Sequence, residues 1–113
     1  MKRKNRLTRR KDFLRVKLIG KPYIHPLVVL VVVKNSLSVT RIAIVASKSI
    51  GSAVKRNRAK RRLRAVMVEV FDSIMVGWDL ILYARKKIND SSYQDIQWAI
   101  DQLLEQADLK VSN

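Results

Sequence analysis

Short apolar segments in the chain have the length and composition of β-strands. Residues 27–34 are rich in valine and lie between a proline and a polar pair, so we expect a strand that is buried on both faces or nearly so. Residues 41–46 are expected to be its hairpin partner, and residues 78–84 form a further apolar strand. A shorter strand is predicted over residues 21–24.

Three other segments show the apolar spacing of helices. Thr8 can cap a short helix over about residues 9–18, and Ser52 or a neighbour can cap the longest helix, which ends near Phe71. A final helix is predicted over about residues 92–107. The order is helix, two or three strands, helix, strand, helix, which favours one sheet with helices packed on it.

Each of the two longer helices has an apolar stripe that we expect to face the sheet. In the longest helix the stripe consists of Ala59, Leu63, Val66 and Val70. In the last helix it consists of Tyr93, Ile96, Ile100, Leu103 and Ala107, with acids on the other side.

The 113 residues are the length of one domain, and we expect a single domain over residues 1–113. The longest apolar run has seven residues, whereas a membrane span needs about 20. The chain has no cysteine, which excludes disulfides, cysteine-based metal sites and a thiol nucleophile. The basic N-terminus is not typical of a secretory signal, so we expect a cytoplasmic protein; an organellar transit peptide is the alternative.

Charge changes this picture because it is divided unevenly along the chain. Residues 1–64 carry 20 Lys and Arg against one acid, Asp12, whereas the remaining residues carry 4 against 8. With a net charge of +15, one side of the domain should attract a polyanion. Nucleic acid is the first expectation, and an anionic membrane surface is the alternative.

Residues 55–64 hold most of the chemistry, because seven of these ten side chains are cationic. On a helix they place like charges three and four residues apart, which costs a few tenths of a kcal/mol per pair. Asn57, Lys60, Arg61 and Arg64 fall roughly opposite the apolar stripe, where they can meet phosphates and base edges. The plainer interpretation is a solvated basic face or a localisation signal.

Other candidates for chemistry are few. Phe13 could stack on an unpaired base, but it could equally anchor its helix to the sheet. His25 is the only histidine and is expected to lie in a loop, and no spacing suggests a metal site or a paired-carboxylate site. The residues describe a binder of RNA that is not a catalyst by itself.

At the basic helix the sequence resembles the bacterial ribonuclease P protein family. The resemblance rests on Ser47-Lys48, Gly51, Ala53-Val54, Arg56-Asn57-Arg58, Lys60-Arg61 and Leu63-Arg64. Weaker similarity extends over nearly the whole chain and includes Asn5-Arg6-Leu7, Asp12-Phe13, Val16, residues 79–85 and Ser92-Tyr93.

This resemblance implies an α+β fold of order α-β-β-β-α-β-α, related to a ribosomal-protein domain, with a left-handed β-α-β crossover. It implies that the protein binds ribonuclease P RNA and the single-stranded 5′ leader of precursor tRNA. It also implies that catalysis and the Mg²⁺ ions belong to the RNA, with no metal bound by the protein. The RNA-binding residues would be Lys48, Arg56, Asn57, Arg58, Lys60, Arg61 and Arg64.

The implied leader cleft lies between the sheet and the first helix, lined by Phe13 and Lys17. Lys17 and Val31 stand where the family often has aromatics, so we expect a less aromatic and more electrostatic cleft. Ser49 and Ser52 also replace a common Lys and Asn. No obligate protein partner is evident. The alternatives are a ribosomal-type structural RNA-binding protein and a peripheral membrane binder, although the basic helix lacks the large aromatics that a membrane helix carries.

Overall fold

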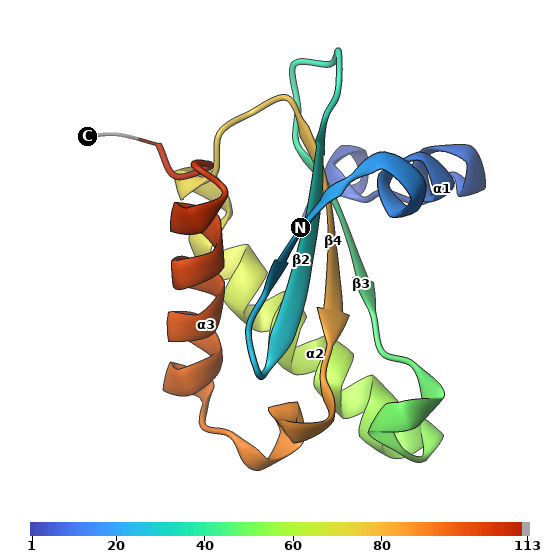
Figure 1. The fold of residues 1–113 in the computed structure, drawn as a ribbon, viewed down its shortest axis with the longest axis vertical. Coiled ribbons are helices and arrows are strands. Elements are labelled where there is room, and N and C mark those ends of the chain that lie inside the picture. The colour runs from blue at the N-terminus through green and yellow to red at the C-terminus, as the bar shows by residue number, and fades with distance from the viewer. Residues whose placement is uncertain (112–113) are drawn as a thin grey trace.

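The computed structural model describes residues 1–111, which form a four-stranded sheet with helices on both faces (Figure 1). The helices are α1 (Arg10–Ile19), α2 (Ala53–Val70) and α3 (Tyr93–Gln106), and the strands are β1 (Lys21–Ile24), β2 (Val28–Lys34), β3 (Arg41–Val45) and β4 (Trp78–Ala84). Short 3-10 turns are η1 (Arg3–Asn5), η2 (Lys48–Ile50), η3 (Phe71–Ser73) and η4 (Lys86–Asp90). The expected order α-β-β-β-α-β-α is confirmed. Within the described range, no helix combines the length and apolar character needed to cross a membrane.

The strand order is β1-β2-β4-β3, so the expected hairpin between β2 and β3 is wrong. β4 lies between them, antiparallel to β2 and parallel to β3. Four of the seven β4 residues in succession, from Asp79 to Leu82, are buried, and such a strand is most stable in the middle of a sheet. Local sequence could not reveal this arrangement, because β4 begins more than 30 residues after the end of β3.

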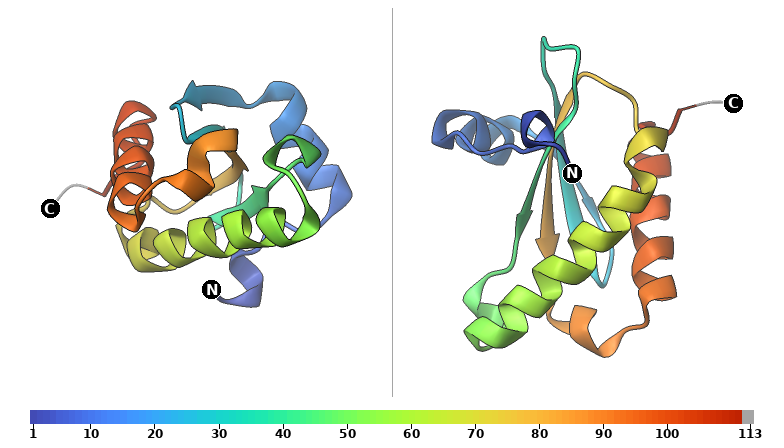
Figure 2. Two further views of the ribbon diagram at one scale, coloured as in Figure 1. Left: turned by 90° about the horizontal axis from the view of Figure 1, so that it is seen from below. Right: turned by 180° about the vertical axis from the view of Figure 1, so that it is seen from behind.

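The connection from β3 through α2 to β4 has the rare left-handed sense. In Figure 1 both strands run downward with β4 to the left of β3, and Figure 2 shows that α2 passes behind them in that view. Parallel crossovers are right-handed in about 98% of cases. A right-handed crossover would place α2 over the opposite face of the sheet, so the left-handed one leaves that face free.

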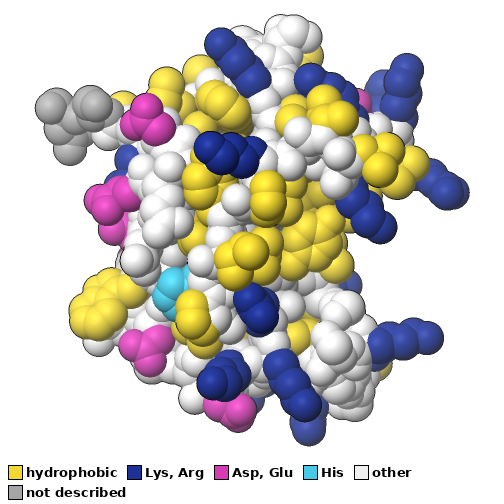
Figure 3. All heavy atoms as spheres, in the orientation of Figure 1, with side chains coloured by type: hydrophobic (Ala, Val, Ile, Leu, Met, Phe, Trp, Pro, Cys, Tyr) yellow, Lys and Arg dark blue, Asp and Glu magenta, His cyan; other side chains and the backbone are white. Residues whose placement is uncertain are grey.

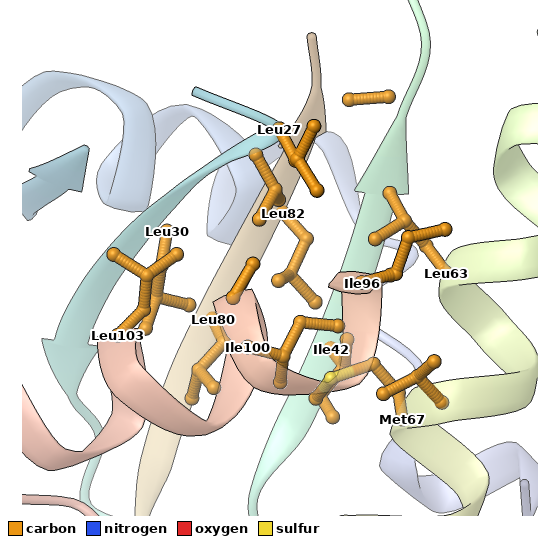
Figure 4. Packing of buried hydrophobic residues seen from close by; sticks show 14 of the residues in the cluster. Leu27, Leu30, Ile42, Leu63, Met67, Leu80, Leu82, Ile96, Ile100 and Leu103 are labelled. Carbon is orange, nitrogen blue, oxygen red and sulfur yellow. The ribbon is translucent and has the colours of Figure 1, made fainter. Parts of the chain in front are cut away.

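The main core lies between the sheet and the helices α2 and α3 (Figure 4). Leu30, Leu80 and Leu82 point from the strands toward Leu63 and Met67 of α2, and Ile96, Ile100 and Leu103 of α3 complete the layer. The predicted stripe of α2 is confirmed for Ala59, Leu63 and Val66, whereas Val70 is only partly buried and Met67 joins the core.

The predicted stripe of α3 is wrong at one end. Tyr93 is 41% exposed, because it begins the helix, where its hydroxyl donates to a Glu69 carboxylate oxygen at 2.5 Å. Ser92 does cap this helix, since its Oγ accepts from the Asp95 backbone N–H at 3.0 Å. Ser52 caps α2 in the same way through the Lys55 N–H.

Thr8 does not cap α1. The helix begins after Arg9, and no side chain caps it. The residues before Thr8 instead extend along the edge of β3, where the Leu7 N–H donates to the Ile42 carbonyl at 2.9 Å. Pairing with the sheet therefore holds Thr8 in the extended segment, one residue too early for the cap.

Candidate RNA interface

The basic helix begins at a turn that only glycine adopts easily. Gly51 has φ +131°, a region that other residues rarely enter, and the Arg56 guanidinium donates to its carbonyl at 2.9 Å. This turn places η2, which carries Lys48, directly before the first turn of α2.

The seven predicted RNA-binding side chains line α2 and the turn before it. Five are exposed and two, Arg56 and Lys60, are half-buried. Within residues 1–111, only Arg56 makes a side-chain hydrogen bond and none pairs with a carboxylate. The predicted set, Lys48, Arg56, Asn57, Arg58, Lys60, Arg61 and Arg64, is thus available to a ligand.

Residues on the flank of α2 make hydrogen bonds within the protein. Arg62 donates to the carbonyls of Ile88 at 2.7 Å and Ser91 at 2.5 Å, while the Asn89 amide donates to the Lys55 carbonyl at 2.9 Å. Burial, and then the positive charge of Arg58, lower the pKa of Arg62 from its ordinary value. Arg62 therefore fixes η4 against α2.

An ion-pair network holds α1 on the other face of the sheet. Arg41 donates to both carboxylate oxygens of Asp79, at 2.9 and 2.7 Å, and to Asp12 of α1 at 3.0 Å. Asp79 is 1% exposed and also accepts from the Asn35 amide at 2.9 Å. The hydrogen bond to Asp79 is the main cause that raises the pKa of Arg41. The only acid of the first 64 residues thus orients α1 instead of repelling an anion.

The C-terminal end of α1 packs tightly against β2. A Cβ atom at Gly20 would collide with the Val16 carbonyl oxygen and with Val31 of β2, so the approach requires glycine. Val16 itself is fully buried between α1 and the sheet. Helix α1 is therefore fixed at both ends, across one end of the sheet.

Beside α1 the sheet face stays open. Figure 3 shows a notch in the molecular outline, with apolar side chains at its floor and Lys and Arg side chains at its rims. A small buried cluster, Leu7, Val16 and Ile81, lies on this face, packed by partly buried side chains that include Phe13, Val31, Val45 and Tyr83. We call this notch the open-face hollow.

Phe13 lies on the open face and Lys17 on the same helix, and their lining of a leader cleft stays a prediction. Phe13 is half-buried and packs against the small cluster, so both its anchoring role and an accessible ring edge fit the structure. Lys17 is exposed on the same helix.

Tyr83 is a candidate that the sequence analysis did not single out. Its register partner is Val29, and it lies two residues from Ile81 on the same strand, so its side chain shares the open face with Val31. Its hydroxyl makes no hydrogen bond within the described chain, and burial raises the pKa of Tyr83. Side chains alternate between the two faces of a strand, so counting from the buried Leu82 would place Tyr83 on the opposite face. Because β4 is apolar on both faces, its sequence does not show this alternation.

The other candidates are not brought together. His25 lies in a turn, where its Nδ1 accepts the Leu27 N–H at 3.1 Å, as expected for a loop residue. Within residues 1–111, no group of three or more His, Asp or Glu side chains is arranged to hold a metal ion.

Comparison with known proteins decides between the two RNA-binding alternatives. Residues 1–108 match the family Ribonuclease P. The chain belongs to the ribonuclease P protein family. It is 41% identical to the ribonuclease P protein component of Herpetosiphon aurantiacus, covering 96% of this chain and 89% of the relative, and 38% identical to that of Dehalococcoides mccartyi over the same shares.

Solved ribonuclease P proteins share the fold. The Staphylococcus aureus protein matches with a TM-score of 0.83 and 27% identity, covering 95% of this chain and 98% of that one. The Thermotoga maritima protein matches with a TM-score of 0.80 and 25% identity, covering 96% and 98%. Membership makes the chain a subunit of an endoribonuclease whose partner is ribonuclease P RNA.

Proposed function

We propose that this chain anchors itself to ribonuclease P RNA through the exposed face of α2 and holds the 5′ leader of precursor tRNA in the open-face hollow. Bound in this way it promotes removal of the leader, which leaves the mature 5′ end of the tRNA. The observation that carries the proposal is the adjacency of two surfaces, one of cations without carboxylate partners in the described chain and one of accessible apolar side chains. Arg64 of α2 lines a hollow together with Leu7 and Ala43 of the open face.

The α2 face has the chemistry that RNA requires. Arginine offers a planar fork of donors for phosphate oxygens, and Asn57 offers a donor and an acceptor for a base edge or a 2′-hydroxyl. Because these side chains have almost no protein partners, binding RNA replaces hydration and counterions without breaking internal bonds.

The hollow has the chemistry of a single-strand site. Phe13 and Tyr83 provide aromatic surface on which unpaired bases can stack, and Lys17 provides a charge for the backbone. Val31, an aliphatic side chain, packs against the same small cluster as the two rings. We therefore expect contacts that tolerate several leader sequences.

Catalysis and the Mg²⁺ ions are proposed to belong to the RNA subunit, where the metal would supply charge stabilisation at the phosphate being cleaved. The protein offers few groups for acid–base work near its RNA face. Asp12 and Asp79 are both paired with Arg41, and His25 accepts a backbone N–H. The contribution of this chain is to bind and position RNA.

The direct test is cleavage of a precursor tRNA by a bacterial ribonuclease P RNA at low Mg²⁺, with and without this protein. The proposal predicts that the protein restores correct 5′ cleavage, does nothing without the RNA, and is weaker as the Arg61→Ala variant. If a known ribonuclease P protein restores cleavage under the same conditions and this chain does not, the proposal is wrong.

A further inference from the structure

A second basic hollow lies on the other side of α1. It is an open depression of about 700 Å³ between α1 and the loop that joins β2 to β3, which projects beyond the sheet in Figure 1. The residues that line it are Arg9, Asp12, Arg15, Lys34, Asn35, Ser36, Leu37 and Arg41. We call it the loop hollow.

The loop hollow is distinct from the open-face hollow. At 100° per residue, Arg15 and Lys17 project about 160° apart around α1. The side chains that line the loop hollow include Arg15, and none of them belongs to the small cluster of the open face. Helix α1 is a wall shared by two separate depressions.

The charges of the loop hollow do not cancel. Arg41 is paired with both Asp12 and Asp79, so this network holds one cation against two carboxylates. In the part of the chain that the structure describes, Arg9, Arg15 and Lys34 have no carboxylate within ion-pair distance. These three cations outweigh the one carboxylate charge that Arg41 leaves uncompensated, so the depression stays positive and favours an anionic ligand.

One of these cations is already oriented. The Arg15 guanidinium donates to the Lys34 carbonyl at 3.1 Å, which ties it to the end of β2 and leaves its other nitrogens without a partner in the described chain. A guanidinium held in this way loses less side-chain entropy when it binds, and its planar donor fork suits phosphate oxygens. The ion-pair network beneath it fixes α1, so the two walls of the hollow keep their spacing.

We infer that the loop hollow binds a phosphodiester group of RNA through Arg9, Arg15 and Lys34. The inference rests on the proposed function, since ribonuclease P RNA or its bound precursor tRNA supplies the phosphodiester. It adds to that function a third contact region, beyond the α2 face and the open-face hollow. RNA is favoured over an acidic protein because the lining offers few apolar side chains to anchor a peptide, Leu37 being the only large one.

The test compares two double variants. One carries Arg15→Gln and Lys34→Gln in the loop hollow. The control carries Lys2→Gln and Lys4→Gln, which remove the same charge from the same half of the chain. Affinity is measured over a series of monovalent salt concentrations, first for ribonuclease P RNA alone and then for precursor tRNA binding to the assembled complex. The first variant should flatten the log–log salt slope by about two units in one of these arms, about one per lost contact. The arm that responds identifies which RNA supplies the phosphodiester.

Equal slopes for both double variants in both arms would overturn the inference while leaving the proposed function intact. If the unchanged protein shows no salt-dependent binding to ribonuclease P RNA, the proposed function itself fails. Thermal melting shows whether Arg15→Gln loosens α1. As a second variant, Arg9→Gln breaks no side-chain hydrogen bond of the described chain. It should still flatten the salt slope by about one unit. An unchanged Arg9→Gln slope counts against the inference.

Discussion

The two faces of the sheet are built from similar residues and have opposite uses. Along β2, Leu30 and Val32 are buried beneath α2 and α3, whereas Val29, Val31 and Val33 on the other face are only partly covered. Helix α1 crosses one end of this second face and leaves the rest open (Figures 1 and 3). The left-handed crossover contributes to the difference, because it places α2 on the same side of the sheet as α3.

If the proposed function holds, stability and RNA binding depend on separate surfaces of the molecule. The covered face excludes water and supplies most of the hydrophobic stabilisation. The open face keeps apolar side chains accessible beside a row of cations. Substitutions on the two faces should therefore affect different measurements.

The largest expected effect is on the covered face. Leu82→Ala deletes a side chain that is 1% exposed and should lower the free energy of unfolding by about 2 to 5 kcal/mol. Val31→Ala, on the open face, should cost no more than about 1.5 kcal/mol. Urea denaturation of both variants measures the difference, and equal losses would break the contrast between the faces.

Phe13→Leu tests the proposed binding role of the open face. Leucine keeps the packing against the small cluster but removes the stacking surface, so leader-dependent binding of precursor tRNA should weaken by about 1 to 3 kcal/mol. Affinity for mature tRNA, which has no leader, is the control. A loss that is the same for both RNAs would place Phe13 outside the leader site.

The α2 face should show its role in the salt dependence. With about six phosphates neutralised, the log–log slope of affinity for ribonuclease P RNA should be about −4 to −5. Arg61→Ala and Arg64→Ala should each flatten it by about one unit. Lys110→Ala, on the acidic side beside Asp101, should leave the slope unchanged and is the matched control.

Tyr83→Phe removes only a hydroxyl from the open-face hollow. If that hydroxyl bonds to the leader, binding of precursor tRNA should weaken by about 0.5 to 1.5 kcal/mol. Tyr23→Phe makes the same change on the covered face, where Tyr23 packs against the main core, and should not alter leader binding. A similar response from both variants would argue against a leader contact at Tyr83.

A smaller effect concerns alkaline stability. Burial raises the pKa of Tyr83 in the folded state, so its neutral form is favoured by folding. Its contribution is fully present below the unfolded pKa of about 10 and is lost as pH rises through the folded pKa. Tyr83→Phe should reduce the loss of stability in this alkaline range. An identical pH profile for variant and parent would contradict the raised pKa.

Much of the fold was predictable from local sequence. Serine caps, valine-rich runs and the spacing of Ala59, Leu63 and Val66 are local signals, and the elements they predicted are confirmed. The pairing of β3 with β4 was not predictable from periodicity, because strand order depends on contacts between distant segments. The crossover sense was implied only by the family resemblance.

The site was predictable in part for the same reason. The seven clustered cations of residues 55–64 are visible in the sequence, and the structure places most of them on an accessible surface, whereas Arg62 bonds to the carbonyls of Ile88 and Ser91. Asp12 orients α1 through Arg41 and Asp79, which lie 29 and 67 residues later in the sequence. Tyr83 was missed because an apolar strand gives no sign of which face is covered.

We propose above all that the open face of this sheet holds the 5′ leader. The most direct measurement is the affinity of the complex of this protein with ribonuclease P RNA for precursor tRNAs whose leaders are shortened one nucleotide at a time to mature tRNA. The account predicts that affinity falls as the leader shortens, and that the RNA without the protein shows a much weaker dependence. The same dependence with and without the protein would contradict it.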